Sequence, residues 1–119
     1  MTALGNQAHL FAHPRHRDAL VHIFGTVLGC ATRTVPLPDT AEPMLALRFP
    51  DGGAPSIEFR PDAPDTQTAT YGAWLEIRTR NLAALRQAVL DAGLSEVHHP
   101  GHEFYFSIPG GQVFAVMPE

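Results

Sequence analysis

Two segments of the chain carry apolar residues at the spacing of an amphipathic helix. The first stripe comprises Leu20, Ile23, Phe24, Val27 and Leu28. The second stripe comprises Leu82, Leu85, Val89 and Ala92. Because residues at i, i+3, i+4, i+7 and i+8 share one face, each stripe predicts a helix with one buried side. Asn81 suits the N-cap of the second helix, and Gly29 and Gly93 are expected to end the two helices.

The other apolar stretches are short and alternate with polar residues, a pattern typical of strands. They lie near residues 8–13, 31–35, 44–49, 56–60, 73–79, 96–99, 103–108 and 112–117. PDGG at 50–53 and PGG at 109–111 predict turns between paired strands. Residues 61–70 are polar and contain proline, so we expect them to be a linker.

The order of the predicted elements repeats once along the chain. Each half reads as a strand, a helix and then three strands, and Leu85 follows Leu20 by 65 positions, as Trp74 follows His9. Such self-similarity indicates two copies of one supersecondary unit. We expect each helix to cover one side of its sheet, which leaves the opposite sides of the two sheets to form a curved cavity.

Composition narrows the class of protein. Charged residues make up 17% of the chain, the formal charge is −4, and every fixed positive side chain is arginine. Nucleic acid is therefore not expected as a partner, because binding it requires many cations on one face. Cys30 is the only cysteine, and no apolar run approaches the ~20 residues of a membrane-spanning helix. With no basic leader at the N-terminus, these features predict a cytoplasmic protein.

Four stretches together resemble the vicinal oxygen chelate superfamily, also called the glyoxalase/bleomycin resistance/dioxygenase group. They are HLFAHPRHRDALVHIFGTVLGC, GGAPSIEFR, WLEIRTRNLAALRQAVLDAG and HEFYFSIPGGQVFAVMPE. The resemblance implies one α+β domain over residues 1–119, built from two βαβββ modules near 8–60 and 72–117. Their sheets would form a curved mixed sheet around a cavity, with the helices on the outer face. The modules of this superfamily pair within one chain or across a homodimer.

The resemblance also implies where a metal ion would bind. Metal-dependent members use one cavity-facing position on the first strand and one on the last strand of each module. In this chain these positions match His9 and Glu58 in the first module, and Trp74 and Ala115 in the second. Indole and methyl groups offer no lone pair to a metal ion. We therefore expect no cofactor. The alternative is one divalent transition metal, such as zinc, nickel, iron or manganese, held by His9 and Glu58.

Other metal ligands are conceivable but less well placed. Glu76 shares the cavity-facing parity of Trp74, yet it lies about 6.6 Å further along its strand. His98, His99 and His102 surround a Pro-Gly turn, where we expect exposed side chains rather than a zinc site. His9 would otherwise bond to the backbone, and Glu58 would pair with a neighbouring cation.

Strand parity predicts the side chains of the cavity wall. Those expected to contact a ligand are Trp74, Phe11, Tyr105, His13, Arg48, Arg78 and Glu76. The aromatic rings would enclose a planar or amphipathic molecule, and the charged groups would orient it. The charges could instead neutralise one another as a polar network.

Two functions from different classes are consistent with this pattern. The first is a small-molecule-binding protein of the bleomycin resistance type, which sequesters its ligand and needs no metal. The second is a metal-dependent lyase, isomerase or dioxygenase of the glyoxalase type, which would use His9 and Glu58, the latter as the candidate catalytic group. Metal-free acid/base catalysis by Glu58 with His13 is a third reading.

Overall fold

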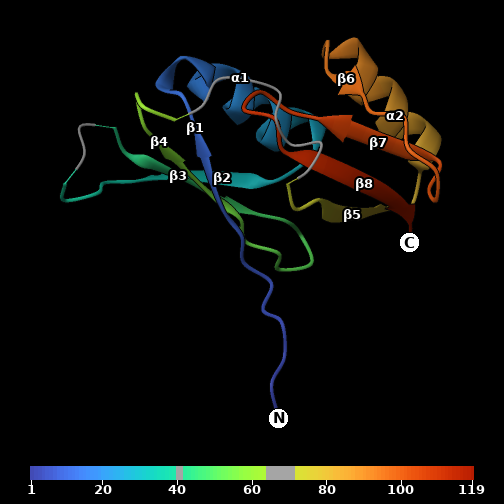
Figure 1. The fold of residues 1–119 in the computed structure, drawn as a ribbon, viewed down its shortest axis with the longest axis horizontal. Coiled ribbons are helices and arrows are strands. Elements are labelled where there is room, and N and C mark those ends of the chain that lie inside the picture. Colours follow the sequence, from blue (N-terminus) through green and yellow to red (C-terminus); the bar gives the residue numbers. More distant parts are fainter. Residues whose placement is uncertain (40–41, 64–71) are drawn as a thin grey trace. The chain divides into compact units, whose positions relative to one another are not determined.

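The computed structural model describes residues 1–39, 42–63 and 72–119 (Figure 1). The chain divides near residue 64 into two compact units, which are described separately below. Of the expected linker at 61–70, residues 64–70 lie outside the described part of the chain. None of the described helices is long and apolar enough to span a membrane.

Each unit contains one four-stranded mixed sheet. The strands of unit 1 are β1 (His9–Ala12), β2 (Ala31–Val35), β3 (Met44–Arg48) and β4 (Ser56–Phe59). The strands of unit 2 are β5 (Leu75–Thr79), β6 (Ser95–Glu96), β7 (Phe104–Ser107) and β8 (Val113–Pro118). The sheet orders are β1-β4-β3-β2 and β5-β8-β7-β6, and in both the first strand pairs parallel with the last. The predicted α+β fold with two repeated βαβββ modules is confirmed.

The helical segment of unit 1 differs from the prediction in its second half. A 3-10 turn, η1 (Pro14–His16), leads into α1 (Arg17–His22), and the chain then continues as a π-helical turn, η2 (Ile23–Val27). In this turn the Leu28 amide donates a hydrogen bond to the Ile23 carbonyl, five residues earlier, at 2.9 Å, whereas an α-helix joins residues four apart. The residues of η2, IFGTV, are glycine or poor helix formers, which weakens the regular α-helical pattern there.

Helix α2 (Leu82–Asp91) begins and ends as predicted. The Asn81 side chain accepts a hydrogen bond from the Ala84 amide, which satisfies one free amide of the first turn. At the other end Gly93 has a φ of 81°, a conformation that favours glycine. The amides of Gly93 and Leu94 then donate to the carbonyls of Leu90 and Val89, a Schellman ending.

Each helical segment covers the apolar face of its own sheet. The Arg17 guanidinium of α1 lies 4.3 Å from the centre of the Phe59 ring of β4, and the Arg86 guanidinium of α2 lies 5.4 Å from that of Phe104 of β7. The largest fully buried side chains, from the helical segments and from the sheets that they cover, are Phe24, Phe59, Phe104, Phe106, Leu20, Leu45, Ile57, Val89 and Val116. The opposite face of each sheet therefore carries the polar residues that the alternation predicts.

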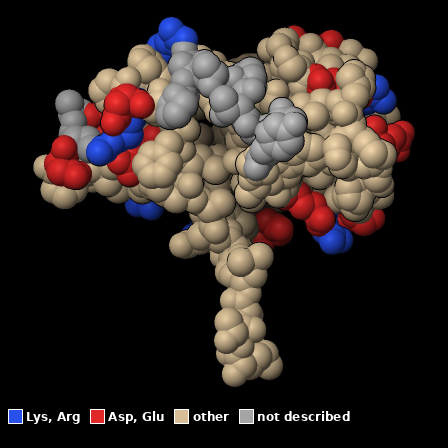
Figure 2. All heavy atoms as spheres, in the orientation of Figure 1, with Lys and Arg blue, Asp and Glu red and all other residues tan. Residues whose placement is uncertain are grey.

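The predicted hairpin turns form, but one predicted strand is misplaced. Gly52, Gly110 and Gly111 adopt positive φ values in the turns that join β3 to β4 and β7 to β8. Strand β6 covers Ser95–Glu96 rather than 96–99. The Val97 amide still donates a hydrogen bond to the Tyr105 carbonyl, and beyond it the chain leaves the sheet towards Pro100. Figure 2 shows acidic and basic side chains interspersed over the visible face.

Candidate functional site

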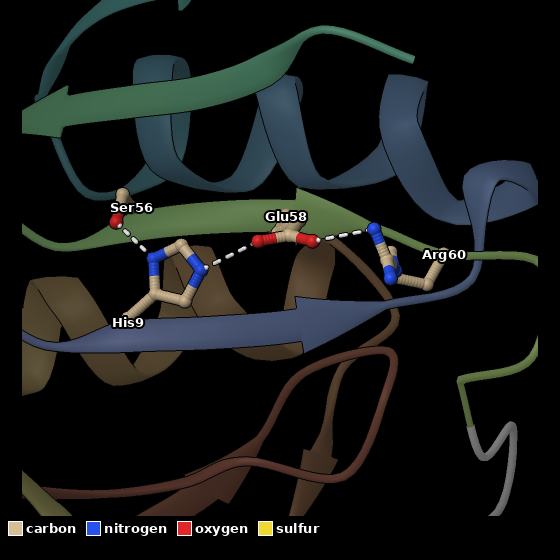
Figure 3. Close-up of polar contacts among 4 residues, drawn as sticks. All are labelled: His9, Ser56, Glu58 and Arg60. Carbon is tan, nitrogen blue, oxygen red and sulfur yellow. Dashed lines mark hydrogen bonds and ion pairs between the residues drawn. The ribbon is translucent and has the colours of Figure 1, made fainter. Parts of the chain in front are cut away.

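A hydrogen-bonded row of polar side chains lies on the sheet face of unit 1 that the helix does not cover (Figure 3). His9 on β1 is opposite Ser56 on the parallel strand β4, and its Nδ1 lies 2.7 Å from the Ser56 hydroxyl. Its Nε2 lies 3.0 Å from Oε1 of Glu58. The other carboxylate oxygen of Glu58 lies 3.0 Å from the Arg60 guanidinium. The structure thus joins three side chains of β1 and β4, and Arg60 just after β4, into one continuous network.

The other predicted site residues of unit 1 lie around this network. Phe11 is 56% exposed, and its ring meets that of His9 edge-on at 5.0 Å. Arg48 is exposed on β3. His13 has a local role, because its Nδ1 accepts a hydrogen bond from the Arg15 amide at the start of η1.

His16 occupies the N-cap position of α1, although its side chain makes no capping hydrogen bond. Burial lowers the pKa of His16, and the nearby charges of Arg15 and His13 lower it further. A neutral imidazole suits this position, because the N-terminus of a helix disfavours positive charge.

Unit 2 presents a cluster of rings in place of a polar network. The Trp74 ring contacts His99 at 4.9 Å and Tyr105 at 5.3 Å, and Tyr105 also meets His99 and His102. Tyr105 is only 4% exposed, and its hydroxyl donates to the Pro100 carbonyl at 3.2 Å. The 98–102 loop therefore packs against the Tyr105 ring, and Trp74 lies half-buried beside it. The contact of Tyr105 with a ligand stays a prediction.

The predicted charges of unit 2 pair with each other. Arg78 donates to Glu76 at 2.7 Å, and both side chains are largely exposed on β5. Together with the contacts of Glu58, this pairing matches the alternative in which the charges of the open faces neutralise one another.

The strand registers of the two modules can be compared at the four positions that the sequence resemblance matched to metal ligands. They show that the pair of positions in one module is equivalent to the pair in the other. In unit 1, Phe11 is opposite Glu58, so His9 lies two residues before the partner of Glu58. In unit 2, Glu76 is opposite Ala115, so Trp74 lies two residues before the partner of Ala115. His9 with Glu58 therefore corresponds to Trp74 with Ala115, and the second module offers an indole and a methyl group where the first offers imidazole and carboxylate.

This set of side chains does not fit a divalent metal ion. Within the described ranges, no group of three or more His, Cys, Asp or Glu side chains is placed to hold one. His9 and Glu58 contact each other directly, and Arg60 holds the second carboxylate oxygen of Glu58. A structural zinc ion needs four ligands and a catalytic zinc ion three from the protein, whereas this pair supplies two.

Cys30 lies outside the candidate site. It is 7% exposed and follows the positive-φ residue Gly29. Burial, with a smaller contribution from the Asp51 charge, raises the pKa of the Cys30 thiol to about 12. The thiol therefore stays protonated near neutral pH, which argues against a nucleophilic role.

Cys30 should accordingly react slowly in the folded protein. At pH 7.5 we expect iodoacetamide to modify native Cys30 at least about 100-fold more slowly than the urea-unfolded chain, because the folded state holds far less thiolate. Mass spectrometry of timed samples would measure both rates. Equal rates would contradict the buried, protonated thiol.

Comparison with known proteins rests on solved structures, since no family model and no curated protein matches the chain. A member of the glyoxalase/bleomycin resistance protein/dioxygenase superfamily from Sphaerobacter thermophilus matches with a TM-score of 0.70 at 14% identity, over 100% of this chain and 99% of that chain. This chain has the vicinal oxygen chelate fold.

Two further structures with the vicinal oxygen chelate fold differ in function. The trypanothione-dependent glyoxalase I of Leishmania major matches with a TM-score of 0.78 at 10% identity, over 99% of this chain and 88% of that chain. TnmS3, an antibiotic-binding protein from Streptomyces, matches with a TM-score of 0.64 at 14% identity, over 98% and 96%. At these identities the matches establish the fold, and function has to be argued from the site.

Two features of the site were not predicted from the sequence. Ser56 shares the parity of Glu58 and lies opposite His9, but only the parallel register of β1 and β4 brings its hydroxyl to the imidazole. The contacts of His99 and His102 with Tyr105 depend on the path of the 98–102 loop. The sequence did contain one indication for Ser56. It lies two residues before Glu58, so on a strand the two side chains are expected on the same face.

Proposed function

We propose that this protein binds a planar or amphipathic small molecule and sequesters it without a metal ion. The observation that supports this most strongly is the register equivalence of His9 with Glu58 and of Trp74 with Ala115. A protein that held a catalytic ion at these positions would need donor groups from both modules. In this chain only the first module has donor groups there. Sequestration needs only complementarity to the ground state of the ligand.

The side chains on the open faces suit an aromatic ligand with polar groups. Trp74 offers a half-buried indole whose position is fixed by its ring contacts with His99 and Tyr105. In unit 2, Trp74 would supply most of the stacking surface, and the neighbouring Glu76 and Arg78 would orient the polar end of the ligand. In unit 1, the exposed Phe11 and Arg48 offer a ring and a charge of the same kinds.

The fold comparison supports binding as a function that this architecture performs. TnmS3 has the vicinal oxygen chelate fold and is described as an antibiotic-binding protein. We further propose that this chain acts as a cytoplasmic homodimer, because superfamily modules pair across subunits and the single cysteine suits a reducing compartment.

Thermal-shift screening of the purified protein tests the proposal. Planar aromatic antibiotics and metabolites would be added over a range of concentrations, in parallel samples with and without EDTA. We expect at least one compound to raise Tm in a saturable way, because a ligand that binds only the folded state stabilises it by about 2.7 kcal/mol at 100 times Kd. A panel with no active compound, or stabilisation that EDTA abolishes, would count against metal-free binding.

A glyoxalase-type metal enzyme is the second candidate. The presence of His9 and Glu58 at two of the four matched ligand positions favours it, as does the fold match to the Leishmania major glyoxalase I. Its difficulty is the donor set, because the described residues of neither unit supply a third ligand. Turnover of 2-oxoaldehyde adducts that depends on added metal, and that the His9→Ala variant loses, would replace the binding proposal with this one.

A further inference from the structure

The polar network of unit 1 connects a hydroxyl, an imidazole and a carboxylate in series. Ser56 Oγ lies 2.7 Å from one nitrogen of His9, and Glu58 Oε1 lies 3.0 Å from the other (Figure 3). This is the arrangement expected of a nucleophile whose base is oriented by a third group. Arg60 in turn pairs with the second carboxylate oxygen of Glu58, so both oxygens of this carboxylate are held.

The acceptor at each end determines where the proton of His9 lies. A carboxylate accepts hydrogen bonds, so we assign the ring proton of His9 to Nε2, which lies 3.0 Å from Oε1 of Glu58. In the neutral imidazole the lone pair is then on Nδ1, which faces the Ser56 hydroxyl. The Ser56 O–H can therefore donate to Nδ1, which is the direction needed to remove its proton.

We propose that Ser56 is a nucleophile activated by His9, with Glu58 as the positioning residue, and that this site hydrolyses small carboxylic esters. Ser56 Oγ attacks the ester carbonyl carbon while its proton passes to His9 Nδ1. The carbon–oxygen bond to the alcohol then breaks, and the alcohol leaves with that proton. Water attacks the acyl-serine, gives a proton to Nδ1, and releases the carboxylic acid as the proton returns to Ser56.

Residues in the same row of the sheet supply space and positive charge. Pairing across the four strands aligns His9, Ser56, Ala46 and Arg33, so all four point to the open face. The small Ala46 leaves room beside Ser56 for an acyl group. Arg33 lies two strands from Ser56, roughly 10 Å between backbones, and its exposed guanidinium has no hydrogen-bond or ion-pair partner among the described residues. Because its side chain shares the face of Ser56, we assign Arg33 the role of stabilising the negative charge that develops on the ester oxygen.

Reagents can reach this site. The His9 side chain is 42% exposed, and Ser56 is half-buried on a sheet face that the helix leaves open. The inference goes beyond ligand sequestration and does not depend on it, because it uses side chains of unit 1 alone and neither Trp74 nor the other rings of unit 2.

Acylation by p-nitrophenyl acetate tests the proposal directly. The full-length protein would be mixed with excess ester, p-nitrophenol release followed by absorbance, and the acetylated residue located by peptide mass spectrometry. We expect acetyl-Ser56 to accumulate and turn over. Ser56→Ala and His9→Gln should each lower the rate at least about 100-fold, the usual contribution of general base catalysis. Arg33→Gln should lower it about 10-fold or more with labelling still at Ser56.

Controls separate this chemistry from surface reactivity and from unfolding. Ser95→Ala removes an exposed serine of β6 and should leave the rate unchanged. Ser56→Cys gives a second readout, since iodoacetamide should modify Cys at position 56 much faster than Cys30, and adding His9→Gln should remove that advantage. Circular dichroism would confirm that each variant is folded. A wild-type rate in folded Ser56→Ala, or an acetyl group found elsewhere, would overturn the proposal.

Discussion

Replacement of Trp74 by alanine is expected to weaken ligand binding about 10-fold to 100-fold, for a planar compound that thermal-shift screening identifies. This corresponds to about 1.4–2.8 kcal/mol of binding free energy. The physical reason is that the indole offers a large, rigid stacking surface, and its contacts with His99 and Tyr105 hold it in place before the ligand arrives. Titration calorimetry of the wild-type and variant proteins would measure the difference.

The Trp74→Phe variant provides the matched control for this effect. It keeps a flat ring at the same position of the chain, so we expect it to retain most of the affinity. Equal affinity in wild-type protein and a folded Trp74→Ala variant would show that Trp74 is an ordinary packing residue of unit 2, and would remove it from the binding site.

Replacement of Phe106 by alanine should cause the largest loss of stability among these variants, about 3–5 kcal/mol in the free energy of unfolding. Phe106 is fully buried, and its ring stacks between Phe104 and Phe114 at centroid distances of 5.8 and 5.5 Å. Alanine would leave a cavity in a core that neighbouring rings cannot easily refill. Urea unfolding followed by circular dichroism would give the value.

Phe11→Ala is the control for this measurement. The same side chain is removed, but Phe11 is 56% exposed, so we expect a change within about 0.5 kcal/mol. Similar losses for the two variants would contradict the assignment of Phe106 to the core and of Phe11 to the open face.

The sequence predicted the fold well where its strands alternate, as β3 and β4 show. In β3 and β4, apolar residues at Leu45, Leu47, Ile57 and Phe59 are buried, and their polar or small neighbours face the other way. With a period of two, placing one residue places the whole strand. The helix caps at Asn81 and Gly93 could also be predicted from the sequence, since both depend on local backbone chemistry.

The site was less predictable because it depends on contacts between distant segments. The His9 and Ser56 side chains meet across 47 positions of the chain, and only the pairing of β1 with β4 fixes their distance. The turn η2 follows an apolar stripe that also fits a regular helix, so the stripe alone did not reveal the wider turn. Likewise, alternation placed Tyr105 on the open face, but did not show that the 98–102 loop would cover it.

We have proposed that this chain binds small molecules without a metal ion at the positions of His9 and Glu58. Titration of Zn²⁺ and Ni²⁺ into EDTA-treated, dialysed protein, followed by calorimetry, tests it most directly, with His9→Ala as the matched variant. We predict no tight stoichiometric binding that distinguishes the two proteins, since one imidazole and one carboxylate are too few donors. One equivalent of metal bound tightly by the wild-type protein and lost in His9→Ala would show instead that His9 is a metal ligand.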